Sequence, residues 1–135
     1  MAALESIIPV VEVASRAGEE FVQLYYESID KRRHVMAPLY SDASQFLWNG
    51  WCGHGLAQVM QLLQRVPSSE HTLHTLDCQP VAAAACNGST QVLVSTEGHV
   101  KYDGDGKTHC FSQQFVLLSE DGVWKILSDC FRFIG

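Results

Sequence analysis

The stretch Val123–Gly135 reads VWKILSDCFRFIG, and its alternation pattern bears directly on the fold. Successive side chains of a strand point to opposite faces of its sheet. A strand with one face in water should therefore carry a mostly polar row on one parity. Neither row does so here, because each mixes large apolar side chains with isolated polar ones such as Asp129 and Arg132. The pattern predicts a strand whose two faces are both covered.

The second half of the chain contains more segments of this kind. Four strands are predicted there, HTLHTLDCQPVA, TQVLVSTEGHVKY, HCFSQQFVLLS and VWKILSDCFRFI. Between them lie turn-forming residues at Asn87-Gly88, Asp103–Gly106 and Glu120–Gly122. An earlier strand, SQFLW, runs into the tight-turn pair Asn49-Gly50. Short connections between consecutive strands favour an antiparallel sheet.

The first half shows helical periodicity instead. Apolar residues recur at three- and four-residue steps from Val10 and predict one long amphipathic helix ending near Asp30. A second, shorter helix is predicted through Met36, stopped or kinked by Pro38, and a third over Gly55–Val66. We therefore expect one α+β domain over residues 1–135, a cone in which one long and two shorter helices pack in the concave side of a curved antiparallel sheet.

Composition narrows the class of partner. The chain has a net charge of −6 with only nine Lys and Arg, whose one cluster, Lys31–Arg33, sits at a predicted helix end. Direct nucleic-acid binding normally needs a basic surface, so we expect none. No apolar run reaches the ~20 residues of a membrane span, and no signal-peptide pattern is present. The expectation is an intracellular protein whose five cysteines are free thiols.

Comparing parities across strands separates two faces of the sheet. One row holds Phe111, Gln113, Phe115 and Leu117, with Leu127, Phe131 and Phe133 in the last strand, and should lie under the helices. The opposite rows are Ser112, Gln114, Val116, Leu118; Trp124, Ile126, Ser128, Cys130, Arg132, Ile134; His71, Leu73, Thr75, Asp77, Gln79; and Gln91, Leu93, Ser95, Glu97, His99, Lys101. Such a mixture is typical of a protein–protein interface, the alternative being an unusually apolar solvated sheet.

Motifs for metal or cofactor chemistry are weak. His71 and His74 have HxxH spacing, but on a strand they point to opposite faces, and no CxxC pair occurs, so no metal or cofactor is expected. A cone could instead enclose a small ligand beside an acid or base, as in an isomerase or dehydratase. The candidates for that role are Tyr25, Tyr26, Tyr40, His74 and Asp129. No spacing singles out a pair among them, so catalysis is disfavoured.

Five blocks, in register across the chain, carry a resemblance. They are LYYESIDKRRHVMAPLY, FLWNG, VPSSEH, LDCQPV and WKILSDCFRF, and together they resemble the nuclear transport factor 2-related export proteins. The resemblance implies a non-enzymatic subunit of nuclear transport factor 2-like fold that forms a heterodimer, sheet against sheet, with the nuclear transport factor 2-like domain of a larger nuclear RNA export factor. It implies a role in mRNA export at the nucleus and nuclear pore, with shuttling to the cytoplasm. Contacts to mRNA and to phenylalanine-glycine repeats of nucleoporins would be indirect, through the large subunit.

The resemblance also assigns residues. Asp77 in LDCQPV corresponds to an acidic residue that pairs with a partner arginine, and Arg132 in SDCFRF to a basic residue that pairs with a partner aspartate. Around them we expect Gln79, Ser95, Gln114 and Cys130, whereas Phe115, Phe131 and Leu76 should face the cone interior. The stretches CGHGLAQVMQLLQRV and AAAACNGS depart from the pattern and leave the choice of large subunit open. The alternative within the transport class is a homodimeric import carrier for a GDP-bound small GTPase.

Overall fold

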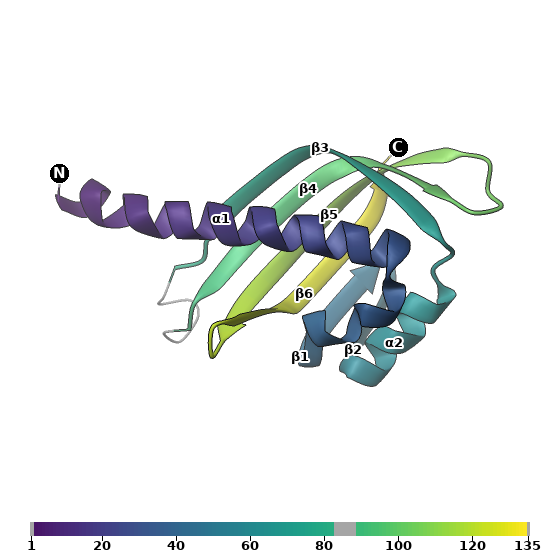
Figure 1. Cartoon of the computed structure of the whole chain (residues 1–135), viewed down its shortest axis with the longest axis horizontal. Coiled ribbons are helices and arrows are strands. Elements are labelled where there is room, and N and C mark those ends of the chain that lie inside the picture. Colours follow the sequence, from purple (N-terminus) through teal and green to yellow (C-terminus); the bar gives the residue numbers. More distant parts are fainter. Residues whose placement is uncertain (1, 83–88, 135) are drawn as a thin grey trace.

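The computed structural model describes residues 2–82 and 89–134 and shows two helices packed on a six-stranded sheet (Figure 1). The helices are α1 (Ala2–Lys31) and α2 (Leu56–Arg65), and the strands are β1 (Tyr40–Trp48), β2 (Trp51–His54), β3 (Ser69–Pro80), β4 (Gln91–Tyr102), β5 (Thr108–Glu120) and β6 (Val123–Ile134). The predicted α+β cone is confirmed. The predicted turn at Asn87-Gly88 and the thiol of Cys86 lie outside the described residues.

The sheet has the strand order β2-β1-β6-β5-β4-β3. Neighbouring strands are antiparallel except β1 and β6, which are parallel. The expectation of a purely antiparallel sheet is therefore wrong for this pair. A parallel pair requires a long connection rather than a tight turn. Because everything from β2 to β5 lies between these two strands in the chain, that requirement is met. The sequence pattern of short turns could not reveal this pair.

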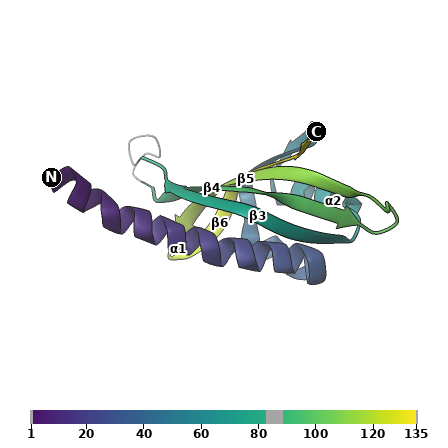
Figure 2. The same cartoon turned by 90° about the horizontal axis from the view of Figure 1, so that it is seen from above.

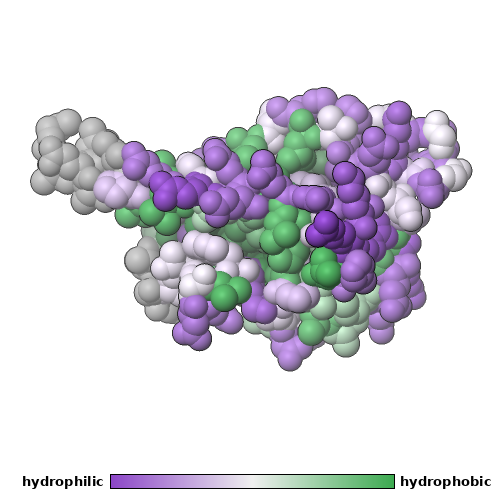
Figure 3. Space-filling view, viewed as in Figure 1, coloured by the Kyte–Doolittle hydropathy of each residue, from purple (hydrophilic) through white to green (hydrophobic). Residues whose placement is uncertain are grey.

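Helix α1 lies along one face of the sheet, which we call the inner face (Figure 2). Its apolar stripe is buried at Ala14, Phe21, Tyr25 and Ile29. The helix begins at Ala2, eight residues before the predicted start, and its first turns extend past the strands (Figure 1). Seen from this side, hydrophilic side chains follow the helix, with hydrophobic surface beside and below it (Figure 3). The inner face is therefore the core face.

The predicted second helix is wrong in detail, because the chain forms two 3₁₀ turns, Arg33–Val35 and Ala37–Leu39. Arg33 holds this segment against the end of α2. Its guanidinium donates hydrogen bonds to the carbonyl oxygens of Leu63 at 3.3 Å and Pro67 at 2.9 Å, and also to that of Val66. These carbonyls follow or end a helix and have few partners within it. Arg33 is thus structural, whereas Lys31 and Arg32 are exposed.

A β-bulge in β6 moves part of that strand to the other face. The register passes from Val116↔Ser128 to Leu117↔Ile126, which leaves Leu127 as the extra residue. Ile126 is consequently fully buried on the inner face, and its predicted outward position is wrong. Trp124 packs against the same core, so its predicted outward position is also wrong. One extra residue in a strand moves the side chains of the residues before it to the opposite face of the sheet.

A second bulge in β3 has the same effect. The register passes from Leu73↔Gly98 to Thr75↔Glu97, so His74 has no Cα partner. His71 pairs with buried Val100 and has its side chain inside, and Leu73 packs on the core, so both predicted outward positions are wrong. Gly98 permits the bulge, because a Cβ there would lie 2.0 Å from the Thr72 carbonyl oxygen.

Leu127, the extra residue of the β6 bulge, is half-buried and outside the core cluster, so its predicted place under the helices is wrong. The rest of the predicted row fares better. Phe111, Phe115 and Leu117 are fully buried and Phe131 is 1% exposed. Phe133 is 39% exposed, so its predicted place under the helices is wrong, since the end of β6 reaches past their cover. Leu76 pairs with buried Thr96 and borders a cleft beside α1, so it lies on the inner face as predicted, but it is 39% exposed because β3 is an edge strand.

Candidate protein–protein interface

The face of the sheet opposite the helices, here called the outer face, carries a continuous row of side chains across five strands. Cα pairing joins Leu47 to Cys130, Cys130 to Gln114, Gln114 to Ser95 and Ser95 to Asp77. The five residues are exposed or half-buried. Four of them were predicted at a partner interface from parity and resemblance. The structure brings these four into one line, which we call the central row.

The two remaining predicted residues occupy the neighbouring rows. Gln79 pairs with Leu93 on one side of the central row, and Arg132 pairs with Ser112 on the other. Successive rows on one face are about 6.6 Å apart, because they are two residues apart along the strand. All six predicted residues therefore lie within three adjacent rows of one face. Whether they bind a partner remains a prediction.

The charges on this face are available for an external partner. Asp77 is exposed and accepts a 3.1 Å hydrogen bond from Gln79 Nε2, and Arg132 is exposed. The ion pairs found among the described residues are His71–Asp30 and His109–Asp105, and neither of these involves Asp77 or Arg132. Asp77 and Arg132 are three strands and one row apart, roughly 15 Å at ordinary strand spacing. They cannot pair with each other, so each can meet a separate opposite charge.

Apolar side chains flank these charges on the outer face. Leu47 is 44% exposed and Ile134 is 40% exposed, and Leu93, Val116 and Leu118 are half-buried. The described contacts of α1 and α2 with the sheet involve the inner face, where Phe46, Val94 and Phe115 are buried. The outer face thus combines an uncovered apolar surface with separated charges, which suits a protein partner better than water alone.

Beneath α1, four of the five residues predicted as acid–base candidates meet around one buried carboxyl group. Asp129, 1% exposed, accepts hydrogen bonds from Tyr40 Oη at 2.9 Å, from Gln113 Nε2 at 2.8 Å and from Tyr25 Oη at 3.5 Å. Tyr26 bonds Gln113 and Thr96 beside them. The predicted candidate His74 is elsewhere, at the sheet edge. Gln113 was missed as a cluster member, although its place between Phe111 and Phe115 in an apolar row was the available signal.

Burial raises the pKa of Asp129 to about 6, although hydrogen bonds from Gln113, Tyr40 and Tyr25 act to lower it. Burial and the nearby Asp129 likewise raise the pKa of Tyr25 and Tyr40 well above the usual value. Tyr25, Tyr40 and Gln113 are at most 1% exposed, so the cluster is sealed from solvent. A groove of about 660 Å³ opens elsewhere, between Trp51, Arg65, Tyr102 and Phe133. No substrate can reach the Asp129 carboxylate in this arrangement.

The part of the chain that is described contains no helix of the length and hydrophobicity that a bilayer crossing requires.

Comparison with known proteins adds an independent line of evidence. Residues 17–133 match the model of the nuclear transport factor 2 (NTF2) domain. The chain is 48% identical over 127 residues to NTF2-related export protein 2 of Mus musculus, covering 91% of this chain and 89% of that protein. A solved structure of NTF2 from Cryptosporidium parvum is 28% identical, with a TM-score of 0.78 over 90% of this chain and 94% of that one.

A more distant structural likeness shows the fold alone. It is to a chain in the crystal structure of the C. albicans Mtr2-Mex67 M domain complex, 16% identical with a TM-score of 0.67. The match covers 85% of this chain and 92% of that one.

Proposed function

The chain belongs to the nuclear transport factor 2 (NTF2) domain family, and from this premise we propose that it is the small subunit of an export receptor. In this proposal its outer face binds the NTF2-like domain of a larger nuclear RNA export factor. The observation that carries the proposal is the uncovered outer face, with its central row and unpaired charges. NTF2-related export protein 2 of Mus musculus, to which the chain is 48% identical, supports the transport class.

Each of the six residues has a role in this proposal. Asp77 bonds an arginine of the large subunit and Arg132 bonds an aspartate. Gln79, Ser95, Gln114 and Cys130 contact the partner around these two charges and exclude water from them. A charge pair desolvated inside an interface can couple by about 1.5–7 kcal/mol, so the two charged residues should dominate the binding energy.

The subunit is proposed to be non-enzymatic, and the sealed Asp129 cluster supports this, since a substrate would have to displace α1 to reach it. The receptor would work at the nucleus and nuclear pore and shuttle to the cytoplasm. With nine Lys and Arg against 15 Asp and Glu, the chain offers little to an RNA backbone. Contacts to mRNA and to phenylalanine-glycine repeats of nucleoporins would be made by the large subunit.

The proposal predicts the mass of the particle in solution. The 15.0 kDa chain will self-associate or aggregate when it is expressed alone, because its apolar outer face is open to water. Co-expression with the NTF2-like domain of an RNA export factor will give a 1:1 complex, as measured by light scattering after size-exclusion chromatography. A stable homodimer that does not bind this domain but binds a GDP-bound small GTPase would favour the import-carrier alternative. A stable monomer that binds neither of them would contradict the proposal.

A further inference from the structure

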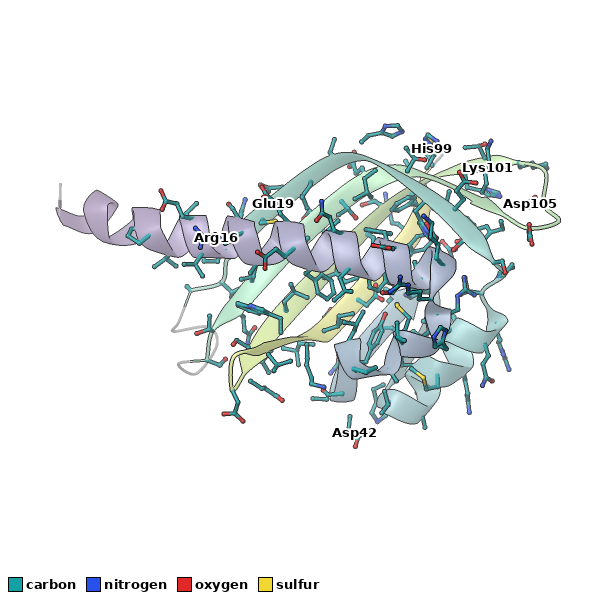
Figure 4. The ribbon with its side chains drawn as sticks, viewed as in Figure 1. Arg16, Glu19, Asp42, His99, Lys101 and Asp105 are labelled. Atoms are coloured by element: carbon teal, nitrogen blue, oxygen red, sulfur yellow. The ribbon has the colours of Figure 1, made fainter. Side chains whose placement is uncertain are left out.

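Two histidines meet at the open edge of the sheet, outside the six residues considered above. His74 Nε2 and His99 Nδ1 are 2.7 Å apart, and the ring centroids are 4.8 Å apart. His99 comes from β4 on the outer face, and Figure 4 labels it on the same strand as Lys101, toward the turn at 103–106. His74 comes from the bulge of β3. Because the bulge frees His74 from Cα pairing, its ring can turn toward its neighbour on β4.

This contact places two metal-binding nitrogens side by side. Neutral imidazole is the commonest metal ligand in proteins, and either ring nitrogen can serve. One nitrogen must donate and the other accept in the present hydrogen bond. If both rings carry their protons on the opposite nitrogens, His74 Nε2 and His99 Nδ1 both present lone pairs to the same point. That tautomer pair is a chelate of two nitrogens.

The spacing fits a shared metal after a small movement. Two nitrogens, each about 2.05 Å from one ion, lie about 2.9 Å apart at a right angle and about 3.4 Å apart at the tetrahedral angle. The observed 2.7 Å therefore needs to open by a few tenths of an ångström. His74 is exposed and His99 half-buried, so side-chain rotation can supply this movement without disturbing the core.

We infer that His74 and His99 form a binding site for a divalent transition-metal ion such as Zn²⁺ or Ni²⁺. Within the described residues, no group of three or more His, Cys, Asp or Glu is placed to hold a metal, so this chain supplies two ligands and water completes the shell. Glu97, two residues before His99, and Cys110, the Cα partner of His99, are neighbours of the pair in the sheet register, and the inference assigns neither as a ligand. The inference does not depend on the proposed function.

Titration calorimetry of the full chain with ZnCl₂, and separately with NiCl₂, tests the site. Cys52→Ser and Cys110→Ser form the background, so that exposed thiols do not compete. One ion per chain is expected, with at least about tenfold weaker binding in His74→Ala and in His99→Ala, because a chelate loses most of its affinity with either ligand. His54→Ala, an exposed histidine on β2, is the matched control and should bind as the background does.

Ring ¹⁵N resonances of the histidines identify the ligand atoms in the same samples. The inference expects Zn²⁺ to shift Nε2 of His74 and Nδ1 of His99 together at one equivalent. Unchanged affinity in His74→Ala, or equal losses in all three alanine variants, would mean scattered binding by surface histidines and would overturn it. Loss confined to one of the pair would also overturn it. Circular dichroism checks folding, and if His99→Ala is unfolded, His74→Ala and the wild-type ring shifts decide.

Discussion

A double charge reversal, Asp77→Lys with Arg132→Glu, will leave the chain folded but weaken binding to the large export subunit at least about 1,000-fold. Both side chains are exposed on the outer face and have no ion-pair partner among the described residues, so the folded state loses little. In the complex, two desolvated attractions become two repulsions. Coupling energies are about 1.5–7 kcal/mol per charge pair, so we expect the double variant to lose about 4 kcal/mol or more of binding free energy.

The matched control for this variant lies on the other side of the sheet. Arg16→Glu with Glu19→Lys makes the same exchange of charges at two exposed positions of α1 that Figure 4 labels. Like the outer-face variant, it leaves the net charge of the chain unchanged. It should bind as the wild type does in calorimetric titration. Reversing the two partner charges should restore binding of the outer-face variant. Wild-type affinity in the Asp77/Arg132 variant would remove these residues from the interface.

Replacing the buried carboxyl, Asp129→Asn, will flatten the pH dependence of stability. The folded-state pKa is raised from 3.8 to about 6, so between these values the folded protein binds more protons than the unfolded chain. The free energy of unfolding therefore falls as pH rises through this window and is constant above it. At about 1.4 kcal/mol per pK unit the full decline is about 3 kcal/mol, of which about 2 kcal/mol falls between pH 4.5 and 7.5.

Urea unfolding of wild type and Asp129→Asn at several pH values in that range measures the effect. The asparagine can still accept a hydrogen bond from Gln113 and contact Tyr40. From pH 4.5 to 7.5 the free energy of unfolding of the variant should therefore rise by about 2 kcal/mol relative to that of the wild type. Asp30 acts below this range, because hydrogen bonds from His71 outweigh its burial and lower its pKa. Asp103→Asn, at an exposed position, is the control. Parallel profiles for Asp129→Asn and wild type would show that this carboxyl is not perturbed.

The sequence predicted five of the six strands and most of the core row, because alternation survives wherever a strand is regular, but it did not predict the short strand β2. Phe111, Phe115 and Phe131 are buried as expected. The errors at Ile126 and His71 both come from bulges, where one extra residue reverses the parity. Alternation alone does not show a bulge. Gly98 was a signal for one of them, since a glycine inside a strand often marks a bulge or a close backbone approach.

The outer face was predictable and the buried cluster only in part. Asp77 and Arg132 lie beyond the bulges in the regular parts of β3 and β6, so their parity was reliable. Tyr25, Tyr40 and Asp129 were candidates by residue type, but their meeting depends on how α1, β1 and β6 come together. Nothing in their sequence spacing encodes that meeting, because they are separated by as many as 104 positions.

The reactivity of Cys130 tests most directly whether the outer face is the surface that the partner covers. Cys130 lies in the central row on the outer face, half-buried in the free chain, whereas Cys78 is a half-buried thiol of β3 on the inner face, beside Gly18 of α1. Labelling with a maleimide, followed by peptide mass spectrometry, compares the two thiols in the free chain, diluted until it is monomeric, and in the 1:1 complex. We expect the complex to slow labelling of Cys130 at least about tenfold and to leave labelling of Cys78 unchanged. Equal labelling of Cys130 in the free chain and in the complex would contradict the account.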